Sequence, residues 1–159
     1  MCEKSESCCF TGHRVIKNEH KEIICQNLLK LINMLVDAGI YNFIAGGALG
    51  FDTLAARAVI KAKKSNPQIK LTLALPCKNQ SYNWNSRNTE EYNHILSLAD
   101  EVIYVSNDYY DGCMQKRNRY MIDNSSHCIF YMTSPRGGTA YTIKYALSCD
   151  TTLHNVITY

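Results

Sequence analysis

The sequence predicts an α/β fold in which a mainly parallel, doubly wound sheet carries helices on both faces. Two observations predict this fold. Short apolar runs alternate with stretches of helical periodicity along the chain, and glycines follow several of the apolar runs. Strictly alternating strands and helices require crossover connections, which place the helices over the faces of a parallel sheet. The predicted architecture is therefore Rossmann-like.

Each predicted element follows from its apolar pattern and its end signals. Strands are predicted at residues 7–12, 41–45, 69–75, 101–105, 127–132 and 153–159. Helices are predicted at residues 18–38, 51–64, 89–98 and 113–124, with a last helix from Gly137-Gly138 to residue 148. Gly39 ends the first helix, Thr89 is the expected N-cap of the third, and residues 78–88 are expected to form a polar loop or lid.

The composition is that of one globular domain spanning residues 1–159. Of the 159 residues, 46% are apolar and 19% are charged, which is enough apolar sequence for a sizeable core. The net charge of +3 is mild, and the basic run Lys61 to Lys64 falls at the end of a predicted helix, where it favours a solvated face. The sequence therefore does not predict nucleic-acid binding.

The chain is expected to be cytoplasmic, because its first residues are polar and no apolar stretch is long enough to cross a membrane. The eight cysteines are expected to stay reduced and to act mostly as small buried hydrophobes. There is no C-x-x-C pair, and Cys8 and Cys9 point to opposite faces of a strand. No structural metal site is therefore predicted.

Three segments that follow predicted strands make up the candidate ligand site, since ligands of such sheets bind beyond the carboxyl ends of the strands. The first segment comprises Thr11, Gly12, His13 and Arg14. Gly12 permits a tight turn, Arg14 suits a phosphate or carboxylate, and His13 can donate, accept or titrate. A plain turn with two exposed polar side chains explains the same residues.

The second segment joins a strand to a helix and comprises Gly46, Gly47, Ala48, Leu49, Gly50, Phe51 and Asp52. Glycines at these spacings allow backbone N–H groups to face an anion, to which the helix N-terminus adds its dipole. Asp52 either caps that helix or contacts a ribose hydroxyl. The segment is not G-x-G-x-x-G, and it lacks the lysine of a P-loop.

The third segment, residues 136–142, enters the last predicted helix. Gly137, Gly138 and Thr139 bring a hydroxyl and free backbone amides together there, which predicts a second anion site. Two such sites in one small domain favour ligand binding over ordinary turns. At the same rim, Pro76 and Trp84 follow the third strand, and Trp84 either stacks on a base or packs in the lid or core.

A fourth group of residues lies near the start of the helix at residues 113–124. Arg117 and Asn118 are expected to face the site from this position, with Arg117 as the candidate catalytic residue. Together with the three segments and with residues 74–77, they resemble the SLOG superfamily, the Rossmann-like group of LOG phosphoribohydrolases, DprA-type DNA-processing proteins and YpsA-like proteins. The YpsA-like branch is the most similar, over residues 9–145.

The resemblance to LOG enzymes extends over two of their motifs. Met114 and Arg117 match M-x-x-R-K in spacing, with Asn118 in place of the lysine, and Gly137 and Gly138 match the paired glycines of PGGxGTxxE. These enzymes cleave the N-glycosidic bond of nucleoside monophosphates. The resemblance thus implies a nucleotide site.

The glutamate of the second LOG motif is missing, since Thr142 or Lys144 occupies its position. Cleavage of a ribosyl bond develops oxocarbenium character, which a nearby carboxylate stabilises. The phosphate site is therefore retained without this carboxylate. Substitute carboxylates would have to come from other strand ends, and the possible ones are Asp52, Asp108, Asp111 and Asp123.

The sequence thus predicts a sensor or binding protein for a phosphate-bearing, nucleotide-derived molecule, either an NAD- or ADP-ribose-like compound or a nucleoside monophosphate. Two alternatives stay open: a LOG-like enzyme that hydrolyses the N-glycosidic bond of nucleotides, and a DprA-like role in DNA processing. No cofactor is required beyond the nucleotide-type ligand. LOG-type proteins associate through helices that flank the sheet, so the resemblance implies a homodimer or a higher homo-oligomer.

Overall fold

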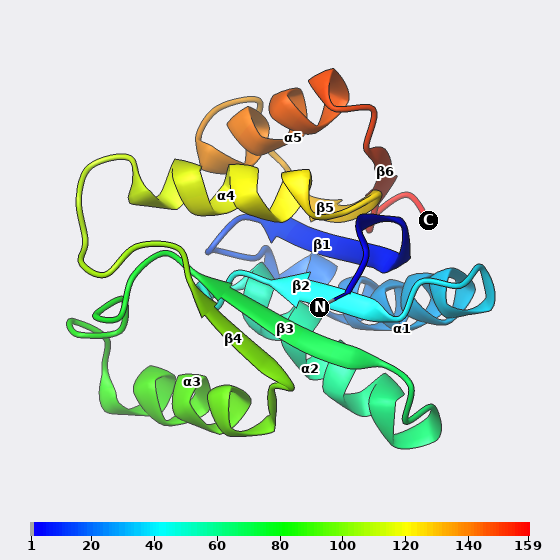
Figure 1. Ribbon diagram of the computed structural model, residues 1–159, viewed down its shortest axis with the longest axis horizontal. Helices are drawn as coiled ribbons and strands as arrows, with labels where there is room; N and C mark the ends of the chain where they lie inside the picture. The colour runs from blue at the N-terminus through cyan, green and yellow to red at the C-terminus, as the bar shows by residue number, and fades with distance from the viewer. Residues whose placement is uncertain (1) are drawn as a thin grey trace.

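A computed structural model describes residues 2–159 and contains one sheet of six parallel strands in the order β4-β3-β2-β1-β5-β6. The chain moves outward from β1 to β4, then returns to lay β5 against the other edge of β1 (Figure 1). The topological switch point therefore lies between β1 and β5. The strands are β1 (Ser7–Gly12), β2 (Asn42–Ala45), β3 (Lys70–Leu75), β4 (Glu101–Tyr104), β5 (His127–Tyr131) and β6 (Thr152–Asn155).

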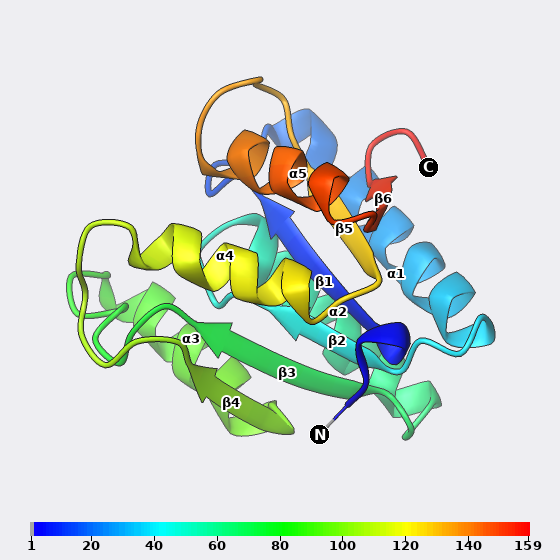
Figure 2. The same ribbon diagram turned by 45° about the horizontal axis from the view of Figure 1, so that its top comes forward.

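Helices cover both faces of this sheet, as the alternating pattern predicts. On one face, α1 packs against α2, and α3 packs against α2 in turn, while α4 and α5 pack together on the opposite face (Figure 2). Two short 3-10 helices, η1 and η2, precede β1 and α1. The helices are η1 (Lys4–Glu6), η2 (Asn18–His20), α1 (Lys21–Asp37), α2 (Phe51–Ser65), α3 (Ser86–Leu98), α4 (Cys113–Asp123) and α5 (Gly138–Ser148).

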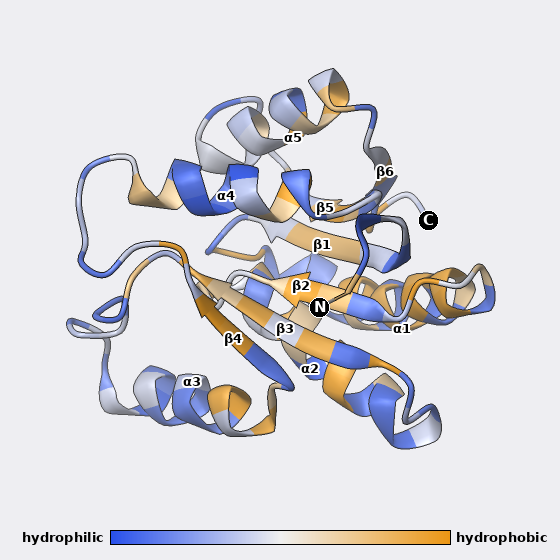
Figure 3. Cartoon of the chain, in the orientation of Figure 1, coloured by the Kyte–Doolittle hydropathy of each residue, from blue (hydrophilic) through white to orange (hydrophobic). Residues whose placement is uncertain are grey.

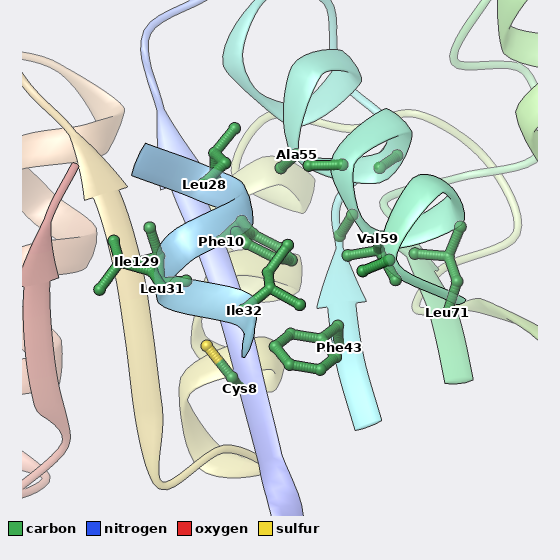
Figure 4. Packing of buried hydrophobic residues seen from close by; sticks show 14 of the residues in the cluster. Cys8, Phe10, Leu28, Leu31, Ile32, Phe43, Ala55, Val59, Leu71 and Ile129 are labelled. Carbon is green, nitrogen blue, oxygen red and sulfur yellow. The ribbon is translucent and has the colours of Figure 1, made fainter. Parts of the chain in front are cut away.

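The larger core lies between the sheet and the helices α1 and α2. Strands and the inward faces of these helices are apolar, while hydrophilic residues gather on the outer helix surfaces (Figure 3). Phe10 of β1 stacks on Phe43 of β2 with ring centroids 6.2 Å apart, and Leu28 and Leu31 of α1 pack beside Phe10 (Figure 4). The apolar periodicity of the first predicted helix therefore marks the face that covers β1.

Several element boundaries differ from the sequence-based expectation, most by one residue; the largest differences lie at the start of α1, where η2 covers residues 18–20, at the start of α3 and at the end of β6. The third helix begins at Ser86, because the Asn85 side-chain oxygen accepts the Asn88 N–H at 2.8 Å, so Asn85 and not Thr89 is the N-cap. The predicted loop at residues 78–88 is correspondingly shorter. The last strand ends at Asn155, whose side chain accepts the N–H of Ile157 at 3.0 Å and turns the chain away from the sheet.

All eight cysteines are free thiols, and five of them are buried, namely Cys8, Cys9, Cys77, Cys113 and Cys128. Cys8 belongs to the core under α1 and α2, whereas Cys9 belongs to the smaller core under α4 and α5, as alternation along a strand requires. Burial raises the pKa of the Cys8 thiol well above its usual value, so this thiol stays protonated. Within residues 2–159, no helix combines the length and apolarity of a membrane span.

Candidate functional site

A cavity of about 280 Å³ opens at the carboxyl end of β1, at the switch point between β1 and β5. We refer to it as the switch-point cavity. Its wall combines the turn after β1, the turn before α2, one face of α4 and the first turn of α5. The lining residues are Phe10, Thr11, Gly12, His13, Arg14, Ala48, Asp52, Met114, Arg117, Asn118, Met121, Gly138 and Thr139.

Most of the predicted site residues therefore meet around one cavity. The residues of the Thr11–Arg14 segment all line it. Residues of α4 and α5, which cover the face of the sheet opposite to α2, join them, namely Arg117, Asn118, Gly138 and Thr139. Five predicted residues lie outside its wall: Gly46, Gly47, Gly50, Pro76 and Gly137. The topology brings the others together because the carboxyl ends of parallel strands share one edge of the sheet.

One wall of the cavity is rich in hydrogen-bond donors. Thr11 and Thr139 are only 5% and 6% exposed, and within residues 2–159 no hydrogen-bond partner engages either hydroxyl. Gly137 is the N-cap of α5 and supplies no side-chain cap, and the first turn contains no acidic residue. The N–H groups of this turn and the helix dipole are therefore uncompensated beside the two hydroxyls.

Arg14 adds a positive charge at the rim of this wall. Its side chain is exposed, and no carboxylate of residues 2–159 forms an ion pair with it. The backbone of Arg14 is fixed, because its carbonyl oxygen packs directly against Gly50. A methyl group at Gly50 would overlap that oxygen, and Gly50 also has φ +81°, so only glycine fits here.

His13 joins the two turns that frame the switch point. Its Nε2 accepts the backbone N–H of Thr133 at 2.9 Å, and its ring meets the Tyr131 ring edge-on with centroids 5.8 Å apart. Partial burial lowers the pKa of His13, which favours the neutral ring. A neutral ring that accepts at Nε2 carries its proton on Nδ1.

On the side of the cavity formed by α2, Asp52 supplies a negatively charged acceptor in place of donors. The residue is buried, and its carboxylate accepts the N–H of Ala48 at 3.2 Å. Burial raises the pKa of Asp52, while Arg117, the Ala48 N–H and Arg14 lower it in part. One amide of the glycine-rich turn is thus already bonded, and a carboxylate stands at the start of α2. This arrangement disfavours an anion at α2 and favours one at α5.

The predicted catalytic residue, Arg117, has most of its donors on protein groups. It is 4% exposed, and its Nη1 donates to the carbonyl oxygens of Gly46 and Ala74, the latter at 3.3 Å. Its Nε donates to the side-chain oxygen of Asn118 at 2.8 Å. Arg117 therefore ties α4 to the ends of β2 and β3, which makes it a positioning residue in the structure.

Several of the predicted glycines serve the close packing of these walls. A methyl group at Gly46 would lie 2.5 Å from Arg117 Nη1 and 2.7 Å from the Asp52 carboxylate. At Gly12, a methyl group would overlap the buried ring of Phe51, which begins α2. The glycines thus let α2 and α4 approach the sheet, a role that the sequence pattern alone did not separate from ligand contact.

Trp84 lies away from the switch-point cavity. Its ring meets the Tyr92 ring of α3 edge-on, with centroids 5.2 Å apart, which supports the packing alternative. It also lines two further cavities, one of about 640 Å³ on the α1–α3 face and one of about 480 Å³ beside Arg14. Within residues 2–159, no cluster of His, Cys, Asp or Glu is arranged to hold a metal ion.

Met114 is a cavity residue that sequence reasoning did not include in the candidate site. It lines both the switch-point cavity and the 480 Å³ cavity, and its sulfur accepts from Arg117 Nη2 at 3.9 Å. The spacing was informative, because residues three apart on a helix share one face. Met114 therefore faces the same rim as Arg117.

The fold and the cavity define a Rossmann-like protein with a donor-rich pocket at the switch point of a parallel sheet. The model of the YspA SLOG family, YpsA, matches residues 8–158. The chain belongs to this family, and the resemblance noted in the sequence is confirmed.

Two bacterial relatives support this assignment. The uncharacterized SPbeta prophage-derived protein YoqJ of Bacillus subtilis is 36% identical over 118 residues, which cover 67% of this chain and 69% of the relative. A UPF0398 protein of Ligilactobacillus salivarius is 31% identical over 128 residues, or 79% of this chain and 70% of the relative. Neither name states a ligand or a reaction.

Solved structures with the same fold extend the comparison. DNA processing protein A (DprA) from Streptococcus pneumoniae has a TM-score of 0.71 at 16% identity, over 96% of this chain and 50% of that one. TM1055 has a TM-score of 0.59 at 16% identity, over 93% of this chain and 72% of that one. These TM-scores establish the shared fold, and this chain spans half of the DprA chain that it matches.

Proposed function

We propose that this protein binds a phosphate-bearing, nucleotide-derived small molecule in the switch-point cavity and acts as a binding or sensing protein. The observation that carries the proposal is the polarity of the cavity. Thr11, Thr139 and the first turn of α5 supply donors on one wall, Arg14 supplies a positive charge at the rim, and Asp52 faces them. A phosphate fits the first wall, and ribose hydroxyls fit the carboxylate.

The volume of the cavity suits a phosphate with its ribose and excludes a whole nucleotide. About 280 Å³ lies just below the range of roughly 300–1,000 Å³ that is typical of small-molecule sites. It is room for a sugar phosphate, with the remainder of a nucleotide extending past Arg14. The carboxylate of Asp52 also orients the ligand, because a phosphate placed beside it would meet like charge in a buried site.

Calorimetric titration with ribose 5-phosphate, AMP, ADP-ribose and NAD tests the proposal. At least one of these compounds is expected to bind, and Arg14→Ala is expected to weaken its binding by about tenfold, the usual scale for one charge-assisted contact. Lys17→Ala is the matched control, since Lys17 is an exposed cation of the same loop outside the cavity wall. No binding by any compound, or equal losses in both variants, contradicts the proposal.

A second candidate function is hydrolysis of the N-glycosidic bond of such a nucleotide. The observation that favours it is Asp52 at the start of α2, which lines the cavity. Its carboxylate can take the role of the LOG glutamate, whose own position is occupied by Thr142 or Lys144. A carboxylate facing the ribose would stabilise a developing oxocarbenium ion. For this candidate, the protein is expected to release free base from AMP. The Asp52→Asn variant should abolish this release while it stays folded and still binds ribose 5-phosphate.

A further inference from the structure

A cavity of about 480 Å³ lies beside the switch-point cavity, and both contain Arg14 and Met114 in their walls. We refer to it as the loop cavity, because it is otherwise lined by the loop after β3 and by Tyr109 of the loop after β4. These loops lie side by side where the strands end (Figures 1 and 2), and the Lys78 N–H donates to the Asn107 carbonyl oxygen at 3.2 Å. The two cavities are therefore adjacent parts of one rim.

Aromatic side chains with free surface line the loop cavity. Tyr82 is 85% exposed and Tyr109 is 60% exposed, and they come from the two different loops. The half-buried Trp84 lies between them in sequence and has its ring held by Tyr92. Large aromatic groups that remain exposed at the edge of a cavity are suited to stack on a planar ring.

Gln80 lines the loop cavity and carries a buried acceptor next to it. Its Nε2 donates to the Gly47 carbonyl oxygen at 2.7 Å, and this contact fixes the orientation of the amide, because a carbonyl oxygen can only accept. Its Oε1 is buried beneath the cavity surface, and it has no hydrogen-bond partner among residues 2–159. A buried acceptor without a partner is costly, so a small movement of this side chain toward a ligand N–H group in the cavity would relieve a real deficit.

We infer that the loop cavity holds the base of the nucleotide and that Gln80 moves slightly toward it, so that Gln80 Oε1 accepts from an exocyclic amino group of that base. This assignment rests on the proposed nucleotide-binding function of the switch-point cavity. The sugar phosphate occupies the switch-point cavity, Arg14 and Met114 form the neck between the two cavities, and the base lies among the aromatic side chains. The ligand class is therefore a ribonucleotide of adenine, guanine or cytosine.

Fluorescence titration tests this inference directly, because Trp84 is the sole tryptophan of the chain and lines the loop cavity. Ribose 5-phosphate is compared with three pairs of nucleotides that differ chiefly in one amino group: AMP with purine riboside monophosphate, GMP with IMP, and CMP with UMP. The amino-bearing member of at least one pair is expected to bind about tenfold tighter than its partner and than ribose 5-phosphate, and to change the Trp84 emission.

Two variants separate the base contacts from general effects on folding, one at Tyr109 and one at Gln80. Tyr109→Ala is expected to remove about tenfold of the nucleotide affinity and to leave that of ribose 5-phosphate unchanged. Tyr110→Ala is the matched control, since Tyr110 is an exposed residue of the same loop that does not line the cavity. Gln80→Met is expected to abolish the preference within the amino pair, while unchanged binding of ribose 5-phosphate shows that the Gly47 turn is intact.

The outcomes distinguish this inference from the proposed function. If ribose 5-phosphate binds and every nucleotide binds with the same affinity, the base assignment is wrong and the phosphate site stands. An unchanged Trp84 emission on binding of the preferred nucleotide also overturns the base assignment. If neither ribose 5-phosphate nor any nucleotide binds, the proposed function and the base assignment both fail.

Discussion

Arg117 of α4 donates a hydrogen bond from Nη1 to the carbonyl oxygen of Gly46, at the point where β2 ends and the turn toward α2 begins. The same guanidinium lies near the buried carboxylate of Asp52, and each charge favours the ionised form of the other. A helix on one face of the sheet is thereby tied to a turn that leads to the other face. The switch-point cavity depends on this link.

Replacement of this arginine tests its positioning role. Arg117→Met removes the donor to the Gly46 and Ala74 carbonyl oxygens and the charge that compensates Asp52, so we expect a loss of about 2–5 kcal/mol in the free energy of unfolding. Urea denaturation measures the loss, and Arg119→Met, an exposed arginine of the same helix, should change stability by no more than about 0.5 kcal/mol. A stable Arg117→Met variant that loses only ligand binding would instead make Arg117 a ligand contact.

Only glycine fits at position 50, because the backbone has a positive φ there and the Arg14 carbonyl oxygen fills the space of a side chain. With φ +81° and the Arg14 carbonyl oxygen against its Cα, Gly50→Ala is expected to cost about 2–4 kcal/mol in unfolding free energy. Gly138→Ala is the matched control, because Gly138 opens α5 and has no atom within 4 Å of an added methyl group. That variant should be neutral or more stable by up to about 1 kcal/mol. Equal losses in the two variants would refute the packing role of Gly50.

The start of α3 offers a test of the corrected helix boundary. Asn85→Ala removes the acceptor of the Asn88 N–H and is expected to lower the free energy of unfolding by about 1 kcal/mol. Thr89→Ala lies within the helix, where alanine is favoured, and should leave stability unchanged or raise it slightly. Thermal unfolding of the two variants compares them, and the reverse order would restore Thr89 as the cap.

A pair of histidines on β5 and β6 predicts acid sensitivity. His127 Nδ1 and His154 Nε2 are 3.0 Å apart in stacked rings, and burial lowers the pKa of both, with His127 lowering that of His154 further. Their ordinary pKa is 6.5, so below this pH the unfolded chain takes up protons that the folded pair resists. The pair therefore has no effect on stability well above pH 6.5 and lowers it as the pH falls below that value.

Urea unfolding at pH 7.5 and pH 5.5 measures this decline. His154→Gln is expected to reduce the difference between the two midpoints, because it removes one depressed pKa and the repulsion within the pair. His94→Gln, at an exposed position of α3, is the control and should retain the full difference. An unchanged difference in His154→Gln would assign the acid sensitivity to other groups.

Much of the fold was predictable because it depends on local periodicity. The apolar spacing of Ile24, Leu28 and Leu31 identifies a helix with one buried face, and that face covers β1. The errors fall at chain ends and caps. Thr89 and Asn85 are both plausible caps by residue type, and only the direction in which the chain enters α3 selects Asn85.

The candidate site was predictable as a set of segments and not as a set of contacts. Parallel topology guarantees that Thr11 and Thr139 meet at one edge of the sheet, so their segments could be grouped in advance. The sequence pattern did not reveal that Gly46 makes room for Arg117, because that depends on how closely α4 approaches β2. The pattern also did not reveal that Met114 lines the cavity, or that Gln80 Oε1 has no hydrogen-bond partner among the described residues.

Hydrophobic periodicity and turn residues act over a few positions, so they predict a parallel α/β sheet with glycine-rich turns at the carboxyl ends of its strands without knowledge of the tertiary structure. Which donors stay available for a ligand depends instead on how the helices pack against the sheet. Arg117 is directed onto the carbonyl oxygens of two strands, Asp52 takes an amide of its own turn, and Thr11, Thr139 and Arg14 are left facing the switch-point cavity. The reason is physical, because a buried polar group is satisfied by whichever partner packing brings within reach.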